Sequence, residues 1–155
     1  MKKRTAIKLP LTGAERQRLR MHHVKIANIL DFAPDELAVL LGVSFERARE
    51  VHGLAEFQTI PSIGLKFAED LVFLGRYSVS ELKESTGAAL LEEYEFKKGY
   101  TTDPCVEDQF RLAVYYANTQ DAGKQWWDFT EERKAYRLKN GYPANRPLRV
   151  WHEYR

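Results

Sequence analysis

Apolar residues along this chain recur mostly three and four positions apart, and no stretch shows the strict alternation of a half-buried strand. The clearest case follows residue 64, with apolar residues at Leu65, Ala68, Leu71 and Val72 and a glycine at Gly75. This spacing places the apolar side chains on one face of a helix. The pattern therefore predicts an all-α fold.

Further helices are expected where similar patterns follow helix-start signals. Thr12 and Glu15 have the spacing of a capping box, and Asp103-Pro104 combines an N-cap with a proline at the first helical position. The expected helices cover residues 12–30, 34–41, 45–57, 65–75, 79–84, 88–97, 103–118 and 130–140. The first of them is expected to bury Leu19, Ile26, Ala27, Leu30 and either His23 or Val24, and to expose Arg16, Arg20 and Lys25.

Residues 57–75 predict a helix-hairpin-helix, in which a tight turn joins two short helices. Pro61 ends the incoming helix because it disfavours the helical conformation of the preceding residue. Gly64 permits a sharp turn or the close approach of another backbone, and Ile63 is expected to be buried beneath the turn. Gly42-Val43-Ser44 repeats this arrangement earlier in the chain. Residues 34–75 are therefore interpreted as a tandem helix-hairpin-helix (SAM-like) core.

The turn at residues 62–66 is a candidate anion site. The first N–H groups of a helix have no partner within it, and together with the helix dipole they favour a phosphate. Lys66 adds a positive charge there. The expected binding residues of the turn are Ser62, Ile63, Gly64, Leu65 and Lys66. Alternatively, the turn is a helical corner that binds nothing.

The turn resembles the helix-hairpin-helix of proteins that bind DNA without sequence preference. The usual turn there is Gly-apolar-Gly, whereas Ser62 takes the place of the first glycine here. The paired hairpins also resemble those of many DNA-repair and recombination proteins. These resemblances imply contact with the phosphates of a DNA backbone.

Three segments are expected along the chain. Residues 1–11 are a basic arm, residues 12–141 are one helical domain, and residues 142–155 are a basic, aromatic tail. Within the domain, the hairpins at 34–75 precede the C-terminal helices at 78–141. A chain of 155 residues is long enough for one domain with a real core.

Charge is distributed unevenly. Residues 1–25 and 133–155 together hold 15 of the 24 basic residues and two of the 22 acidic ones, which leaves residues 26–132 with a net charge of −11. A polyanion should therefore prefer the two ends of the chain. The basic residues expected to assist DNA binding are Arg16, Arg20, Arg146 and Arg149. Alternatively, the helix charges are an ordinary solvated face, and the tail folds back on the acidic middle.

No constellation of residues predicts catalysis, a metal site or a cofactor. Cys105 is a single cysteine, expected to be buried and inert, and His22 and His23 are adjacent and so point to different sides of a helix. The acidic groups Glu92-Glu93-Glu95 and Asp103-Glu107-Asp108 are interpreted as solvated faces. No apolar run reaches the ~18 residues of a membrane span. One cysteine fits a reducing, cytoplasmic setting.

Trp126 and Trp127 permit two interpretations. They are expected to pack against the helix at residues 103–118, since a helical protein of this size needs large apolar anchors. Alternatively, they form a stacking surface for unpaired bases.

Four motifs in order, IPSIGLKFAEDLVFLG, YSVSELKE, DPCVEDQFRLAVYYA and WWDFTEER, resemble the small bacterial helix-hairpin-helix family called pathogenicity locus proteins, sometimes labelled mitomycin resistance proteins. The resemblance covers residues 34–133. It implies an all-helical domain and a role in binding DNA, and it brings no reaction with it.

The function expected from the sequence is non-enzymatic, sequence-independent DNA binding through backbone phosphates. The alternative is a protein–protein adaptor, or a self-associating protein, whose acidic helical body makes no contact with DNA.

Overall fold

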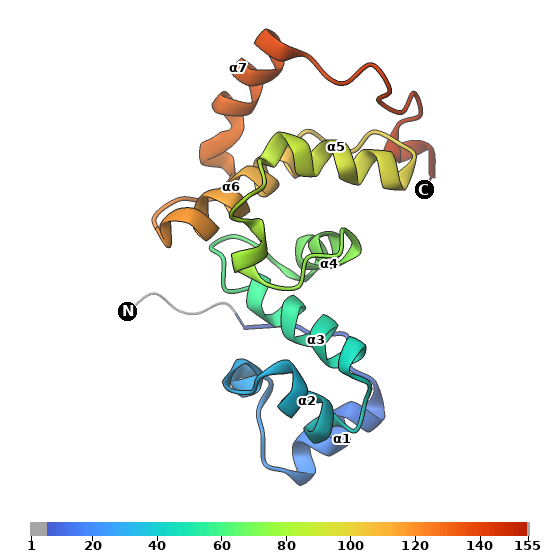
Figure 1. Cartoon of the computed structure of the whole chain (residues 1–155), viewed down its shortest axis with the longest axis vertical. Coiled ribbons are helices and arrows are strands. Elements are labelled where there is room, and N and C mark those ends of the chain that lie inside the picture. Colours follow the sequence, from blue (N-terminus) through green and yellow to red (C-terminus); the bar gives the residue numbers. More distant parts are fainter. Residues whose placement is uncertain (1–5, 155) are drawn as a thin grey trace. The chain divides into compact units, whose positions relative to one another are not determined.

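The computed structural model describes residues 6–154, except the side chains of residues 153 and 154 (Figure 1). Within that range the chain is helical, and the pairing of Thr101 with Val150 is an isolated bridge outside any strand. The all-α prediction is confirmed. Most of the basic arm, residues 1–5, lies outside the described residues, as does Arg155 of the tail.

The chain divides into two compact units, which we describe separately. The first comprises residues 1–59 and 63–78, and the second comprises residues 60–62 and 79–155. The elements of the first unit are α1 (Gly13–Met21), the 3-10 helix η1 (Ile26–Asp31), α2 (Pro34–Leu41), α3 (Phe45–Phe57) and α4 (Leu65–Phe73).

Helix α1 ends earlier than expected. Its capping box of Thr12 and Glu15 is present, but the helix stops at Met21, and the prediction of one helix over residues 12–30 is wrong. His23 adopts a left-handed φ of 56°, and the Val24 N–H donates to the Leu19 carbonyl at 2.9 Å, which closes the helix. The core then takes the expected Leu19 together with Ile29. The other residues expected in the core are half-buried (Val24, Ile26, Leu30) or exposed (His23, Ala27).

Helices α2 and α3 have the predicted bounds. Gly42 ends α2 with a left-handed φ of 67°, and the Ser44 side chain caps α3 by accepting the Arg47 N–H. The C-terminus of α2 also receives Arg18, whose guanidinium donates to the carbonyls of Val39 and Leu40 at 3.0 Å each. This basic side chain of α1 therefore closes a helix end rather than facing solvent.

A buried ion pair fixes α1 to α3. Glu15 is 3% exposed, and both its oxygens accept from the Arg47 guanidinium at 2.9 Å. The hydrogen bonds from Arg47 hold the pKa of Glu15 below its ordinary value of 4.5. Arg47 also donates to the Pro10 carbonyl, which ties the segment before α1 to the same place.

The second unit contains the 3-10 helix η2 (Val79–Leu82), α5 (Gly87–Lys98), α6 (Cys105–Thr119), the 3-10 helix η3 (Trp126–Phe129), α7 (Thr130–Asn140) and the 3-10 helix η4 (Trp151–Tyr154). A single 3-10 turn replaces the helix expected at residues 79–84. Asp103 accepts the Cys105 N–H at 2.8 Å, but α6 begins at Cys105 with Pro104 as its N-cap, so the predicted N-cap at Asp103 is wrong by one residue. Helix α7 has its predicted bounds.

Helix α5 lies alongside α6 (Figure 1), and a glycine permits the close approach. A Cβ on Gly87 would lie 2.8 Å from the Cα of Arg111, closer than real side chains approach. The predicted face of α5, with Leu90, Leu91 and Tyr94, is buried, and the Tyr94 ring packs on Phe110 with centroids 5.9 Å apart.

Three acidic residues expected to be solvated are buried, and that prediction is wrong. Glu95, Glu107 and Asp108 are at most 1% exposed. Glu107 accepts from Arg111 at 2.9 Å and from Arg137 at 2.8 Å. Burying a carboxylate is costly unless it is paired and hydrogen-bonded, and these pairs supply the partners.

The same network continues from Asp108 into α7. The carboxylate of Asp108 accepts from the Arg133 guanidinium and from the Thr130 hydroxyl, both at 2.8 Å. Arg133 and Thr130 lie in the first two turns of α7. This helix is therefore attached to α6 largely through buried charges rather than through a wide apolar face.

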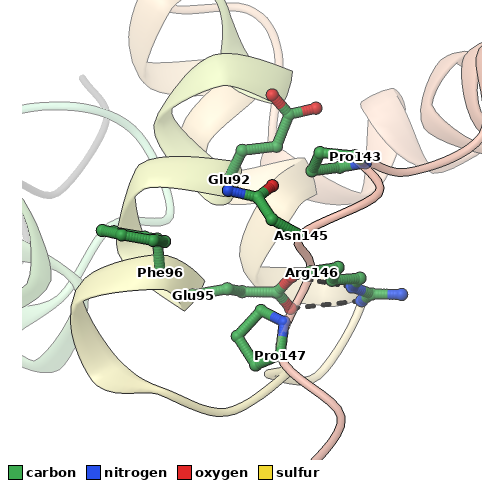
Figure 2. A pocket seen from close by; sticks show the side chains of 7 residues that line it. All are labelled: Glu92, Glu95, Phe96, Pro143, Asn145, Arg146 and Pro147. Atoms are coloured by element: carbon green, nitrogen blue, oxygen red, sulfur yellow. Dashed lines mark hydrogen bonds and ion pairs between the residues drawn. The ribbon is translucent and has the colours of Figure 1, made fainter.

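The tail folds back on α5, which was one of the two alternatives for it. Arg146 pairs with Glu95 at 2.8 Å, as Figure 2 shows, and the Thr102 N–H donates to the same carboxylate. The Tyr142 ring lies between two guanidinium groups, 4.2 Å from that of Arg137 and 3.5 Å from that of Arg146. The basic C-terminal residues thus neutralise acids from the middle of the chain.

Candidate nucleic-acid interface

The turn between α3 and α4 contains the candidate anion site. Helix α3 ends at Phe57, ahead of Pro61, and α4 begins at Leu65. Ile60 and Ile63 are 1% and 4% exposed, so both apolar residues of the turn are buried. Ser62 and Gly64, which flank Ile63, are exposed. The turn therefore presents backbone at the surface over an apolar base.

Ser62 occupies the left-handed conformation, with φ of 61°. This explains how a serine can stand where the usual hairpin has glycine, since the backbone keeps the conformation that glycine favours. The left-handed region costs a non-glycine residue about 1–2 kcal/mol. A hydrogen bond from the Trp126 N–H to Ser62 Oγ, at 3.1 Å, offsets part of that cost.

Nothing within the folded chain requires a glycine at position 64. Its φ of −103° and ψ of −172° are extended backbone that any residue adopts. A Cβ built on it would meet no atom within 4 Å. The space beside Gly64 is therefore open to a group from outside the protein.

The N-terminus of α4 differs from the other helix starts in its cap and in its charge. Gly64 is the N-cap and provides no side-chain hydrogen bond, and the first turn holds no acidic residue. By contrast, Thr12, Ser44 and Thr86 cap α1, α3 and α5 with side-chain oxygens. Lys66 in the first turn of α4 is exposed. The positive end of this helix dipole is thus offset by no cap and no first-turn carboxylate.

The predicted basic residues divide between the two units. Arg16 and Arg20 are exposed on α1, in the unit that contains α4, and Arg16 makes a long bond of 3.4 Å to the Leu9 carbonyl. Arg146 and Arg149 belong to the second unit. Arg146 is paired with Glu95, and the Arg149 carbonyl accepts the Thr101 N–H at 2.8 Å. The structure thus gives Arg146 a structural task that the sequence pattern did not show.

A small cavity lies between α5 and the tail. Its volume is about 150 Å³, and its lining consists of Glu92, Glu95, Phe96, Pro143, Asn145, Arg146 and Pro147 (Figure 2). Both glutamates already bind arginines: Glu92 binds Arg137 at 3.0 Å, and Glu95 binds Arg146. The cavity is therefore a packing gap beside an ion pair, with no unpaired acid to act on a ligand.

Cys105 differs from its prediction, because it is exposed rather than buried. Desolvation, followed by a hydrogen bond with Asp103, raises the pKa of the thiol. The thiol therefore stays protonated at neutral pH, which is the opposite of an activated nucleophile. Across residues 6–154, His, Cys, Asp and Glu side chains form no group of three suited to a metal ion.

The two tryptophans differ in their burial. The 3-10 helix η3 packs on α6, and its buried residue is Phe129, 6% exposed, which the sequence interpretation did not single out. Trp126 is half-buried, whereas Trp127 is 56% exposed. A WWxF motif marks an aromatic cluster, but the periodicity of one short turn does not tell which ring faces the core.

Within the described residues, every helix is too short or too polar to cross a membrane.

A family model described as "Pathogenicity locus" matches residues 50–135. The chain belongs to the pathogenicity locus family. The resemblance drawn from the four motifs is thereby confirmed. No curated protein and no solved structure matches the chain.

The pathogenicity locus match covers some candidate residues and leaves others out. It includes the turn at residues 62–66, the tryptophan pair and the buried acids Glu107 and Asp108. Arg16, Arg20, Arg146 and Arg149 lie outside it. The turn is thus part of the family's common region, and the flanking basic residues lie beyond that region.

Proposed function

We propose that this protein binds DNA without sequence preference and without catalysing a reaction, through the turn between α3 and α4 acting as a helix-hairpin-helix. The open N-terminus of α4 at Gly64 is the observation that carries the proposal. We further propose that the α2–α3 turn at Gly42 is the second hairpin of a tandem, SAM-like core.

The binding step places a backbone phosphate against the first amides of α4. Those N–H groups point along the helix axis toward the phosphate, and the dipole adds a favourable charge interaction. Lys66 contributes its ammonium group as a point charge. Gly64 leaves room for the sugar-phosphate because no Cβ stands in the way.

Longer-range attraction comes from exposed basic residues. Arg16 and Arg20 are exposed on α1. Contacts of this kind position a protein on the phosphate backbone and carry no sequence information. Arg16 and Arg20 therefore attract the phosphate backbone more strongly than Arg146 does, because the charge of Arg146 is paired with Glu95.

Gly64→Asp tests the proposal. An aspartate at the N-cap accepts first-turn amides of α4, so the variant should fold as stably as the wild type or more so. It also fills the phosphate position with a negative charge. We expect the affinity for a short fluorescent duplex, measured by anisotropy, to fall roughly tenfold or more, since charge-assisted hydrogen bonds contribute ~1.5–3 kcal/mol.

Ala89→Asp is the matched control. It adds the same charge at an exposed position in the first turn of α5, a helix that Thr86 already caps. Its affinity for the duplex should stay within about twofold of the wild type, a difference under 0.5 kcal/mol. An equal loss of duplex affinity in both variants would mean that net charge, not the α4 turn, determines binding.

A second candidate function, a protein–protein adaptor, has one observation in its favour. Leu138 and Leu148 are 92% and 98% exposed, and Phe96 is 67% exposed, all within the second unit. Replacing Leu138 and Leu148 by serine should then abolish self-association in sedimentation velocity experiments. A wild-type protein that sediments as a monomer at all concentrations would oppose the self-associating form of this candidate.

A further inference from the structure

The second unit presents an aromatic pair on a firmly attached turn. The rings of Trp126 and Trp127 meet edge to face, with centroids 5.4 Å apart. Phe129, at the end of the same turn, is buried against α6 and tilts onto the Tyr115 ring at 5.4 Å. The exposed indole of Trp127 is therefore carried on an anchored element, not on a loose loop.

A cation lies next to this aromatic cluster. The ammonium of Lys124 is 4.9 Å from the Tyr115 ring centroid and 5.6 Å from that of Phe129. The nearby carboxylates have partners: Asp128 accepts the Gln125 N–H, and Asp121 accepts the Gly123 N–H and the Tyr115 hydroxyl. Lys124 is itself exposed and precedes Trp127 by three residues in the chain. Single-stranded nucleic acids bind surfaces that combine positive charge with exposed aromatic rings.

The aromatic pair is also tied to the hairpin turn. The Trp126 N–H donates to Ser62 Oγ at 3.1 Å, and both residues belong to the second unit.

We propose that Trp127 stacks on an unpaired base, so that the protein's ligand is single-stranded DNA or DNA with unpaired nucleotides. This inference rests on the proposed function, and it specifies the form of DNA. A base within a duplex is already stacked on both faces, whereas an unpaired base offers a free face to the indole. Stacking of this kind tolerates any sequence because every base has a π-face.

Oligothymidylate and a duplex of equal length, each with a fluorescent label, are the probes. Trp127→Ala should weaken oligothymidylate binding roughly 5- to 100-fold, the effect of removing one base–aromatic stack, and should change duplex binding less than twofold. Trp127→Phe retains a ring and should lose less affinity. Phe96→Ala, which removes another exposed aromatic of the second unit, is the control and should change neither.

Intrinsic fluorescence gives an independent readout. Oligothymidylate should quench the wild-type tryptophan emission, and most of that quenching should vanish in Trp127→Phe although binding persists. Trp127 is more than half exposed, so these variants should fold, which circular dichroism checks.

Three results would overturn the inference. One is unchanged oligothymidylate affinity in Trp127→Ala while Gly64→Asp still weakens DNA binding; in that case the proposed function stands alone. Another is an equal loss of affinity for oligothymidylate and for the duplex in Trp127→Ala. If the wild type binds neither probe, the proposed function and this inference fall together.

Discussion

Ser62 and Gly64 lie two residues apart, and each has a backbone conformation that its residue type does not lead one to expect. Ser62 adopts a conformation that suits glycine, and a bond from the Trp126 N–H to its hydroxyl holds it there. Gly64 adopts a conformation open to any residue and touches nothing that a side chain would displace. The sequence shows which residues stand at these positions, but only the backbone shows that Ser62 is left-handed and Gly64 is extended.

Ser62→Ala should destabilise the protein by about 1 kcal/mol, because it removes the acceptor of the Trp126 N–H and keeps the left-handed strain. Ser62→Gly also removes the hydroxyl but relieves the strain, so it should cost less than alanine. Urea unfolding of both variants measures the difference. A glycine variant less stable than the alanine variant would contradict this account.

Glu15 is expected to make stability depend on pH. Hydrogen bonds from Arg47 lower its pKa in the folded protein below the ordinary 4.5. In acid the unfolded chain then binds a proton that the folded chain resists, so the stabilisation is present above 4.5 and is lost as the pH falls through the lowered folded pKa. Glu15→Gln should be less stable than the wild type at pH 7, and the gap should narrow in acid. Unfolding measurements at pH 7 and in acid check this prediction. A difference in unfolding free energy between the two proteins that does not change with pH would refute it.

Helices with distinct start and stop signals are those that the sequence predicts best. Helix α2 has Pro34 at its start and Gly42 at its end, and Ser44 caps α3. The end of α1 was missed because His23 is an unusual residue for a left-handed position and the apolar spacing continues past it. Periodicity reports which face is apolar and gives no indication of where the backbone leaves the helix.

The buried acids of α6 were missed for a related reason. Glu107 and Asp108 are charged, so a hydrophobic pattern assigns them to solvent, and their partners Arg133 and Arg137 lie on α7. Pairing between elements distant in the chain cannot be deduced from spacing within one element. The end of α3 at Phe57 and the start of α4 at Leu65 were predictable because Pro61 and the apolar spacing that indicate them are local.

Glu107→Ala should destabilise the second unit by roughly 3–5 kcal/mol, because Arg111 and Arg137 would keep buried charge without their partner. Glu131→Ala is the control, since its pair with Lys134 is exposed and should contribute less than about 1 kcal/mol. Thermal unfolding measured by calorimetry compares the two. Similar losses in both variants would show that the α6–α7 pairs are not a main source of stability.

Across the whole molecule, the uneven distribution of charge serves the fold as well as any ligand. The acidic middle and the basic C-terminal segment meet inside the second unit, where Arg133, Arg137 and Arg146 bind Asp108, Glu107 and Glu95. Composition predicts the sign of each segment and leaves open whether its partner is DNA or the chain itself. In the first unit, Lys8, Arg16, Arg20 and Lys25 are exposed.

Arg146 distinguishes these two uses of charge. If its main task is to neutralise buried Glu95, Arg146→Ala should lower the melting temperature markedly, since breaking such a pair costs ~3 kcal/mol or more. Arg20→Ala, an exposed change, should leave the melting temperature unchanged and weaken DNA binding. An Arg146 variant with full stability and reduced DNA affinity would reverse the assignment.

The most direct test of the central claim is the affinity of the intact protein for two short DNA duplexes of unrelated sequence, measured over a series of salt concentrations. Contact with backbone phosphates predicts similar affinity for both duplexes and a linear fall of log K with log salt, with a slope of about −0.9 for each phosphate neutralised. Absence of binding at low salt, or affinity that does not change with salt, would contradict the account.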